Sequence, residues 1–213
     1  MIQKQPVSPS RVRHVPYDLF FVSLVTNTDD FIWRMVKGCI QLGLVPNINN
    51  TINMVPVDHV ALCTSLAAVS PLPNASLSVL HIQASPLPTF NSVLSSLLKY
   101  GFATEPCEYL VWRRKLEQHA VEDNALFPLL HFVLDDLPTS TKAPELDDTN
   151  TRRLLGEGKY EEGKSVDDEL MGLYLAWLVS AGFLPSPSLE ESERKLPEII
   201  SDGIIRAAGR SGI

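Results

Sequence analysis

Tyr160 and Lys164 come nearest to a catalytic pair in this sequence of 213 residues. On one helix, a lysine four residues after a tyrosine lies beside the phenol and makes its proton easier to lose. Reductases that use a nicotinamide need such an acidic tyrosine. Here Glu161 and Glu162 would hold Lys164 charged without helping Tyr160 ionise, and the segment is rich in glycine. We therefore predict a loop and assign no catalytic residue, keeping an independent enzyme that uses this pair as an alternative.

The other titratable residues fit structural roles better than catalytic ones. Asp58 and His59 are adjacent, and neighbouring residues on a helix diverge, so we expect a helix cap at Asp58 and a surface or boundary position for His59. His81, His119 and His131 have no second ligand three or four residues away, so we assign no metal-binding residue. No glycine-rich turn for a dinucleotide and no Gly-x-Ser-x-Gly elbow occurs in the sequence.

Composition limits the classes of partner. The net charge is −7, and the longest basic run is Arg113 to Lys115, which argues against nucleic acid. No apolar run reaches the length of a membrane span, so we predict no membrane contact. Cys39, Cys63 and Cys107 are an odd number at wide spacing, which favours reduced thiols and a cytoplasmic location.

The segment from Gly38 to Ala61 predicts the order helix, turn, strand and helix. Gly43 is placed to end the first helix in a left-handed conformation, and Pro46 prevents that helix from restarting. The range Thr51 to Val57 is β-branched and apolar, which predicts a buried strand. We expect Asp58 to cap the second helix, with about 1 kcal/mol lost in Asp58→Ala.

The first helix carries a wide apolar stripe that must be buried against something. We predict a cap at Asn27 or Thr28, and we expect the chain by itself to expose the stripe and therefore to self-associate. The stripe consists of Phe31, Ile32, Met35, Val36, Cys39 and Ile40.

Further helices and strands follow from the periodicity. Thr89 caps an amphipathic helix that Gly101 closes, with Phe90, Val93, Leu94, Leu97 and Leu98 on its apolar face. Trp112, Trp177 and Tyr174 are expected as core anchors. We predict strands at 77–82 and 107–111, helices at 112–119, 124–134, 151–155 and 169–180, a capping box from Ser165 to Asp168, and a helix end at Gly182.

Five segments of the sequence together resemble one known family: Thr26 to Phe31, Arg34 to Ala61, Glu122 to Asp136, Lys142 to Asp148 and Leu173 to Leu178. They are similar to the late part of the thioester reductase domain of the L-2-aminoadipate reductases of fungal lysine biosynthesis. The resemblance covers roughly Thr26 to Pro185.

The resemblance implies an extended short-chain dehydrogenase fold, NADPH as reductant, and reduction of an aminoacyl thioester on a phosphopantetheine arm to an aldehyde. We expect an α/β chain, mostly helical with a few strands, that lacks the N-terminal Rossmann half. On this interpretation residues 1–25 form an atypical N-terminal segment, 26–185 the C-terminal part of the reductase domain, and 186–213 a weakly ordered tail.

The resemblance also implies what the chain needs from elsewhere. Its partners would be the missing Rossmann half or the carrier domain of the parent enzyme. Because the sequence offers neither a glycine-rich loop nor a supported catalytic pair, we assign no cofactor-binding residue and expect no activity from the chain alone. A non-catalytic interaction module is the alternative from another class.

Overall fold

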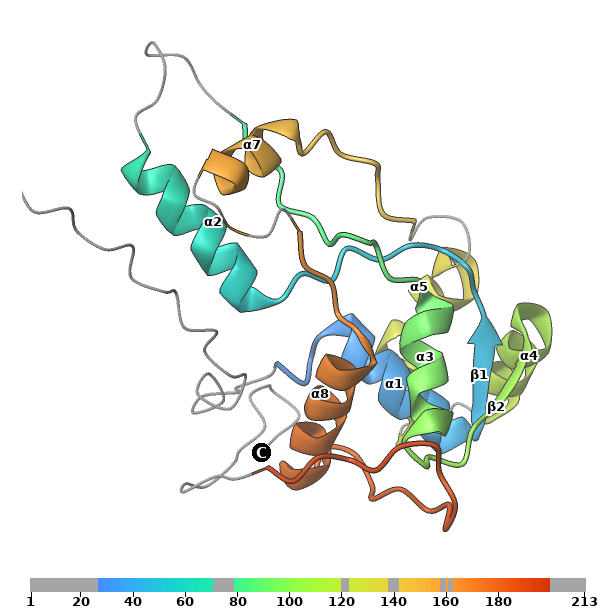
Figure 1. Ribbon diagram of the computed structural model, residues 1–213. Helices are drawn as coiled ribbons and strands as arrows, with labels where there is room; N and C mark the ends of the chain where they lie inside the picture. The colour runs from blue at the N-terminus through green and yellow to red at the C-terminus, as the bar shows by residue number, and fades with distance from the viewer. Residues whose placement is uncertain are drawn as a thin grey trace, which may run out of the picture.

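The computed structural model describes residues 27–70, 79–119, 123–137, 142–157, 160 and 163–199 (Figure 1). The predictions for residues 1–25, for the first residues of the strand at 77–82 and for the end of the tail lie outside this part. The described residues are mostly helical. Their elements are α1 (Phe31–Leu42), β1 (Leu44–Asn47), α2 (Val57–Val69), α3 (Phe90–Lys99), β2 (Glu105–Glu108), α4 (Tyr109–His119), the 3-10 helix η3 (Phe127–Leu129), α5 (Leu130–Asp135), α7 (Thr149–Glu157) and α8 (Asp168–Ser180).

The sheet has two parallel strands. Leu44 of β1 lies opposite Glu105 of β2, and Asn47 lies opposite Glu108 at the carboxyl ends. Parallel strands need a long crossover connection, which here contains α2 and α3. Helices α1, α3 and α4 all contact β1, so the sheet lies between helices (Figure 1).

Apolar residues from α1, α3, α4 and α8 form the core. Trp112 and Trp177 are buried in it, as predicted, and Tyr174 is partly buried with its ring edge-on to Trp33 at 5.5 Å. The prediction that the α1 stripe is exposed is wrong. Met35, Val36 and Cys39 are buried by the chain's own helices, and the remaining stripe residues pack against the core.

The start and end of α1 differ in how well the sequence specifies them. Gly43 ends the helix with φ of 69°, as predicted. The N-cap is Asp30 instead of Asn27 or Thr28, because the Asp30 carboxylate accepts a hydrogen bond from the Ile32 amide at 2.8 Å. A carboxylate and an amide side chain are about equally good caps, so the local sequence leaves this choice open.

The predicted strand from Thr51 to Val57 is absent from the structure. Thr51 makes only an isolated antiparallel bridge to Thr89, and the Ile52 amide donates to Pro88 at 2.8 Å. Pro88 and Pro56 have no N–H, so a ladder cannot continue through either proline. The strand lies earlier instead, where Pro46 is part of β1 and not of a turn.

Helix α2 also begins differently from the prediction. Its N-cap is Pro56, and Asp58 lies in the first turn without any capping hydrogen bond from its side chain. Asp58 therefore does not cap α2. His59 is buried at 3% exposure, so its predicted surface or boundary position is wrong as well.

Helix α3 confirms its prediction almost fully. The Thr89 hydroxyl accepts from the Ser92 amide, the Ser92 hydroxyl accepts from the Thr89 amide, and Gly101 follows with φ of 85°. Four of the five predicted apolar residues are buried, whereas Leu98 is 47% exposed.

The predicted strand at 77–82 is wrong where it can be compared, because its described residues 79–82 form no strand. The other elements are present with shifted boundaries. Strand β2 ends at Glu108, so α4 begins three residues before the predicted helix. Pro128 lies in η3, which separates the predicted helix at 124–134 into η3 and α5. Helix α7 is longer than predicted. The cap of α8 is Asp167, whose carboxylate accepts from the Leu170 amide, in place of the box beginning at Ser165.

The last described segment is attached to the helices. Gly182 follows α8 with φ of 73°, as predicted. Within residues 186–199 no helix or strand is present, but the amides of Ser188 and Leu189 both donate to the Gly101 carbonyl at 3.0 Å. The Arg194 amide donates to Lys99, so this part of the predicted tail lies along the end of α3.

Candidate functional site

A groove of about 570 Å³ lies between α3 and the sheet. This volume is in the range of small-molecule sites. Its walls come from one side of α3, from both strands and from Thr104. They consist of Val45, Pro46, Asn47, Asn91, Leu94, Ser95, Leu98, Thr104, Pro106, Cys107 and Glu108.

Two asparagines from distant parts of the chain form the polar end of this α3–sheet groove. The side-chain Nδ2 of Asn91 donates to the side-chain Oδ1 of Asn47 at 2.8 Å, and the Oδ1 of Asn91 accepts from the backbone amide of Ile48 at 2.7 Å. Asn47 is the last residue of β1, so these groups lie where a parallel strand ends. Ligands in α/β folds bind at this end of the strands.

The rest of the groove is apolar or acidic. Leu94, Leu98 and Pro106 supply carbon surface, and Glu108 places a carboxylate beside Asn47 in the register of the sheet. Burial raises the pKa of the Cys107 thiol, and the negative Glu108 raises it further. Cys107 therefore stays a neutral thiol at neutral pH and is a poor nucleophile. The groove suits an uncharged chain that carries amides, and Glu108 disfavours an anion there.

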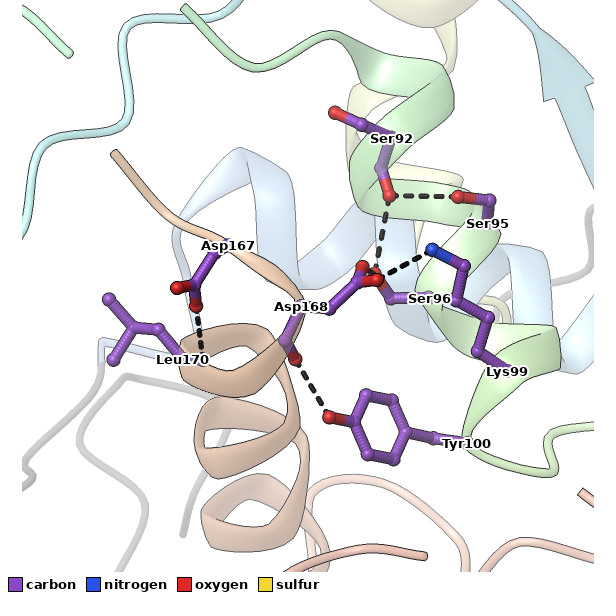
Figure 2. Close-up of polar contacts among 8 residues, drawn as sticks. All are labelled: Ser92, Ser95, Ser96, Lys99, Tyr100, Asp167, Asp168 and Leu170. Atoms are coloured by element: carbon purple, nitrogen blue, oxygen red, sulfur yellow. Dashed lines mark hydrogen bonds and ion pairs between the residues drawn. The ribbon is translucent and has the colours of Figure 1, made fainter. Parts of the chain in front are cut away.

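A second polar cluster joins α3 to α8 (Figure 2). Lys99 donates to the Asp168 carboxylate at 2.7 Å, the Tyr100 hydroxyl donates to the Asp168 carbonyl at 2.8 Å, and the Ser96 hydroxyl donates to the same carboxylate at 3.4 Å. The Lys99 hydrogen bond lowers the pKa of Asp168. The cavity beside this cluster is only about 110 Å³, so the cluster is a contact between two helices and not a ligand site.

The structure does not bring Tyr160 and Lys164 into catalytic geometry. Helix α7 ends at Glu157, α8 begins at Asp168, and both residues lie in the connection between them. The Tyr160 amide donates to Leu155, while the Lys164 carbonyl accepts from the Ser85 amide. The two side chains therefore do not share the face of one helix, in agreement with the prediction of a loop.

The histidines His81 and His119, to which the sequence assigns no metal-binding role, contact different parts of the chain. His81 is held by Asp147, with its ring Nδ1 at 2.8 Å from the carbonyl oxygen, and His119 contacts the Lys115 carbonyl. In the part of the chain that the structure describes, no group of three His, Cys, Asp or Glu side chains is placed to hold a metal ion. Cys39, Cys63 and Cys107 are free thiols, and burial raises the pKa of Cys39.

The described residues do not fit a dinucleotide. A pyrophosphate needs a glycine-rich strand-to-helix turn whose amides face the ligand. Strand β2 runs directly into α4 at Glu108 and Tyr109, which offer a carboxylate and no glycine. The connection from β1 to α2, residues 48–56, also contains no glycine. We therefore do not place NADPH on these residues and assign them no step of a reduction.

Sequence reasoning missed the asparagine pair. Pro46 and Asn47 were expected in a turn, and Asn91 was not distinguished from the other polar residues of its helix. The two residues are 44 positions apart, and no local pattern connects them. The one feature of the sequence that could have drawn attention to this region is the group of asparagines after Asn47, at positions 49, 50 and 53.

Curated relatives match most of the chain. It is 48% identical over 200 residues to L-2-aminoadipate reductase of Schizosaccharomyces pombe, covering 87% of this chain and 14% of that protein. It is 42% identical over 181 residues to L-2-aminoadipate reductase of Saccharomyces cerevisiae, covering 81% of this chain and 13% of that protein. The chain thus spans about one seventh of the length of these relatives. Residues 23–64 match an NAD-binding family model described as Male sterility protein.

Two solved structures share the fold. The terminal R domain from the myxalamid PKS-NRPS biosynthetic pathway has a TM-score of 0.63 and 27% identity, covering 76% of this chain and 41% of that one. A thiolation-reductase di-domain from an archaeal non-ribosomal peptide synthetase has a TM-score of 0.51 at 16% identity, covering 65% of this chain and 28% of that one. The fold is therefore that of part of a reductase domain of the extended short-chain dehydrogenase type.

Over most of its length the chain is similar to fungal L-2-aminoadipate reductases, and its fold matches part of a reductase domain. Among the described residues, no helix is both long and apolar enough to cross a membrane.

Proposed function

We propose that this chain forms the substrate side of a reductase domain that converts a carrier-bound aminoadipyl thioester to the semialdehyde in lysine biosynthesis. The support is the identity of 48% to a fungal L-2-aminoadipate reductase over 87% of the chain. The reductant is NADPH, bound by a part of the domain that these residues do not supply. The partners are that nucleotide-binding part and the carrier domain.

The α3–sheet groove is the observation that carries this proposal. A phosphopantetheine arm is a long chain with two amides, and the groove combines amide side chains at one end with the apolar surface of Leu94 and Leu98. Asn47 and Asn91 would hold an amide of the arm. Glu108 would repel its phosphate, so the phosphate would remain outside the groove. Helix α3 flanks this path.

A chimeric enzyme tests the assignment. In the S. pombe reductase, residues 27–199 of this chain replace the matching segment, and NADPH oxidation is followed with an aminoadipyl thioester on the carrier. The proposal expects turnover. A folded chimera without turnover would contradict it.

Two substitutions in the same chimera test the groove. Asn47→Leu removes an amide from the groove and is expected to raise the KM for the carrier-bound thioester about tenfold, since a hydrogen-bond partner proposed for the arm is lost. The KM for NADPH should not change. Asn49→Leu is the matched control, because Asn49 is exposed and does not line the groove. If both substitutions changed the KM for the carrier-bound thioester equally, the result would contradict binding of the arm in this groove.

The chain by itself is proposed to be inactive. Neither strand-to-helix connection offers a site for a pyrophosphate, and Tyr160 and Lys164 do not lie on one helix. Titration calorimetry with NADPH should give no binding heat at micromolar concentrations. Consumption of NADPH that Tyr160→Phe abolishes would support the independent enzyme instead.

A cytoplasmic location remains a proposal, supported by three free thiols. We no longer expect self-association through the α1 stripe, because Met35 and Val36 are buried in the chain's own core. The alternative of a non-catalytic interaction module would gain support if the chimera folded, bound the carrier and never turned over.

A further inference from the structure

Helix α2 is apolar all round and almost free of charge. Its 13 residues contain one charged side chain, Asp58 in the first turn, and from His59 to Val69 the helix has no Asp, Glu, Lys or Arg. A surface helix normally carries charge on its outer side, whereas a helix that is apolar all round is normally buried. The sequence of α2 is therefore that of an interior helix.

The structure nevertheless leaves most of α2 uncovered. Only His59 and Cys63 are buried, and α7 is the helix that packs against α2 (Figure 1). Val57 is 79% exposed and Val69 is 78% exposed. These are the two most exposed large apolar side chains of the described residues.

One side of α2 forms a continuous uncharged surface. Val57, Ala61, Thr64 and Ala68 recur at the spacing that places residues on one face of a helix, and all four are exposed. We call these four residues the α2 outer face. Their side chains are short, so a second element can approach the helix backbone closely.

The family match indicates what covers this face. The segment that matches the NAD-binding family, residues 23–64, extends through the first two turns of α2, so this helix is part of what the chain shares with nucleotide-binding domains. The chain covers 41% of the solved R domain, so most of such a domain is contributed by other residues. In α/β domains, helices of this type cover a sheet.

We infer that the α2 outer face is the docking surface for the sheet of the nucleotide-binding part of the reductase domain. This inference rests on the proposed function and adds to it a specific internal interface. Contact there would also fix α2, and with it the connection 48–56, relative to the cofactor part. The groove would be positioned through the same connection, because residues 48–56 follow Asn47 directly.

A buried charge on the outer face tests the inference. Ala61→Glu is made in the chain and in the chimeric reductase. In the chain, the melting temperature should change by little, since Ala61 is exposed there. In the chimera, an unpaired carboxylate would be buried, and NADPH oxidation should fall more than tenfold. Ala103→Glu is the matched control, because Ala103 is exposed and lies outside α2; it should leave both proteins unchanged.

Hydrogen exchange provides a second readout that does not depend on turnover. The α2 amides should exchange at least tenfold more slowly in the chimera than in the chain alone. A chimera that tolerates Ala61→Glu, or whose α2 amides exchange as fast as in the chain alone, would overturn the inference. An inactive chimera with protected α2 amides would instead count against the proposed function and leave the interface supported. If the chain alone were a dimer that Ala61→Glu dissociates, the face would be an interface between copies and the inference would be wrong.

Discussion

Helices α2 and α3 follow one another along the chain and behave in opposite ways. Helix α3 has apolar residues on one face, a capping box at its start, and five buried residues that pack against the sheet and α8. Helix α2 has no side-chain cap, no separate polar face, and two buried residues. The described residues complete the environment of α3 and leave that of α2 incomplete. The sequence of α2 anticipates a neighbour that the described part of the chain does not provide.

Truncation of a buried leucine in α3 should cause the largest loss of stability among the variants that compare α3 with α2. Leu97 is fully buried, so Leu97→Ala is expected to lower the free energy of unfolding by about 3 kcal/mol, through lost burial and a residual cavity. Val69→Ala in α2 should cost less than about 0.5 kcal/mol, as for most exposed positions. Urea unfolding monitored by circular dichroism gives both values. Similar losses would mean that α2 is covered in the chain alone.

A methyl group between α3 and α8 should give the next largest effect. A Cβ at Gly172 would lie 2.3 Å from the Tyr100 hydroxyl, so Gly172→Ala is expected to cost about 2 kcal/mol through overpacking. The double variant with Tyr100→Leu should lose less than the sum of the single losses, because the contact is removed. Additive losses in the same urea assay would show that the two helices do not meet in this way.

The N-termini of α3 and α2 should respond differently when the side chain at Thr89 or at Asp58 is removed. Thr89→Ala removes the box of α3 and should cost about 1 kcal/mol, whereas Thr89→Ser should cost less. Asp58→Ala should cost at most about 0.5 kcal/mol, since Asp58 makes no capping hydrogen bond and only complements the helix dipole. A loss at Asp58 as large as at Thr89 would restore the capping role predicted from the sequence.

The smallest expected effect is a pH dependence of the contact between α3 and α8. The hydrogen bond from Lys99 lowers the pKa of Asp168 below its unfolded value. The pair therefore contributes stability above the unfolded pKa of about 4, and the contribution is lost as the pH falls through the folded pKa. The contribution should be under about 1 kcal/mol, because the pair is partly exposed.

A double-mutant cycle measures this contribution. With Lys99→Met and Asp168→Asn, the coupling free energy should be favourable at pH 7 and smaller at pH 3. A coupling that grows as the pH falls would contradict the direction of the pKa shift.

Local sequence was sufficient where neighbouring residues carry the structural information. The cap at Thr89, the apolar spacing of α3 and the helix ends at Gly43 and Gly182 were all predicted, because each depends on hydrogen bonds and sterics within a few residues. The loop between α7 and α8, which denies Tyr160 and Lys164 a common helix, was predicted from glycine and like charges in the same way. The fold class followed from the resemblance of several segments together.

Only the tertiary structure decided the features that depend on distant pairing. Residues 44–47 form a strand despite Pro46 because residues 105–108 lie alongside them. Residues 51–57 lack a strand because Pro56 within the segment and Pro88 opposite Ile52 have no N–H. The polar end of the groove exists because Asn47 and Asn91 meet across 44 residues. The sequence by itself showed that α1 needs cover, but burial depends on which helices meet. Among the described residues α1 is covered, whereas α2 is left largely exposed.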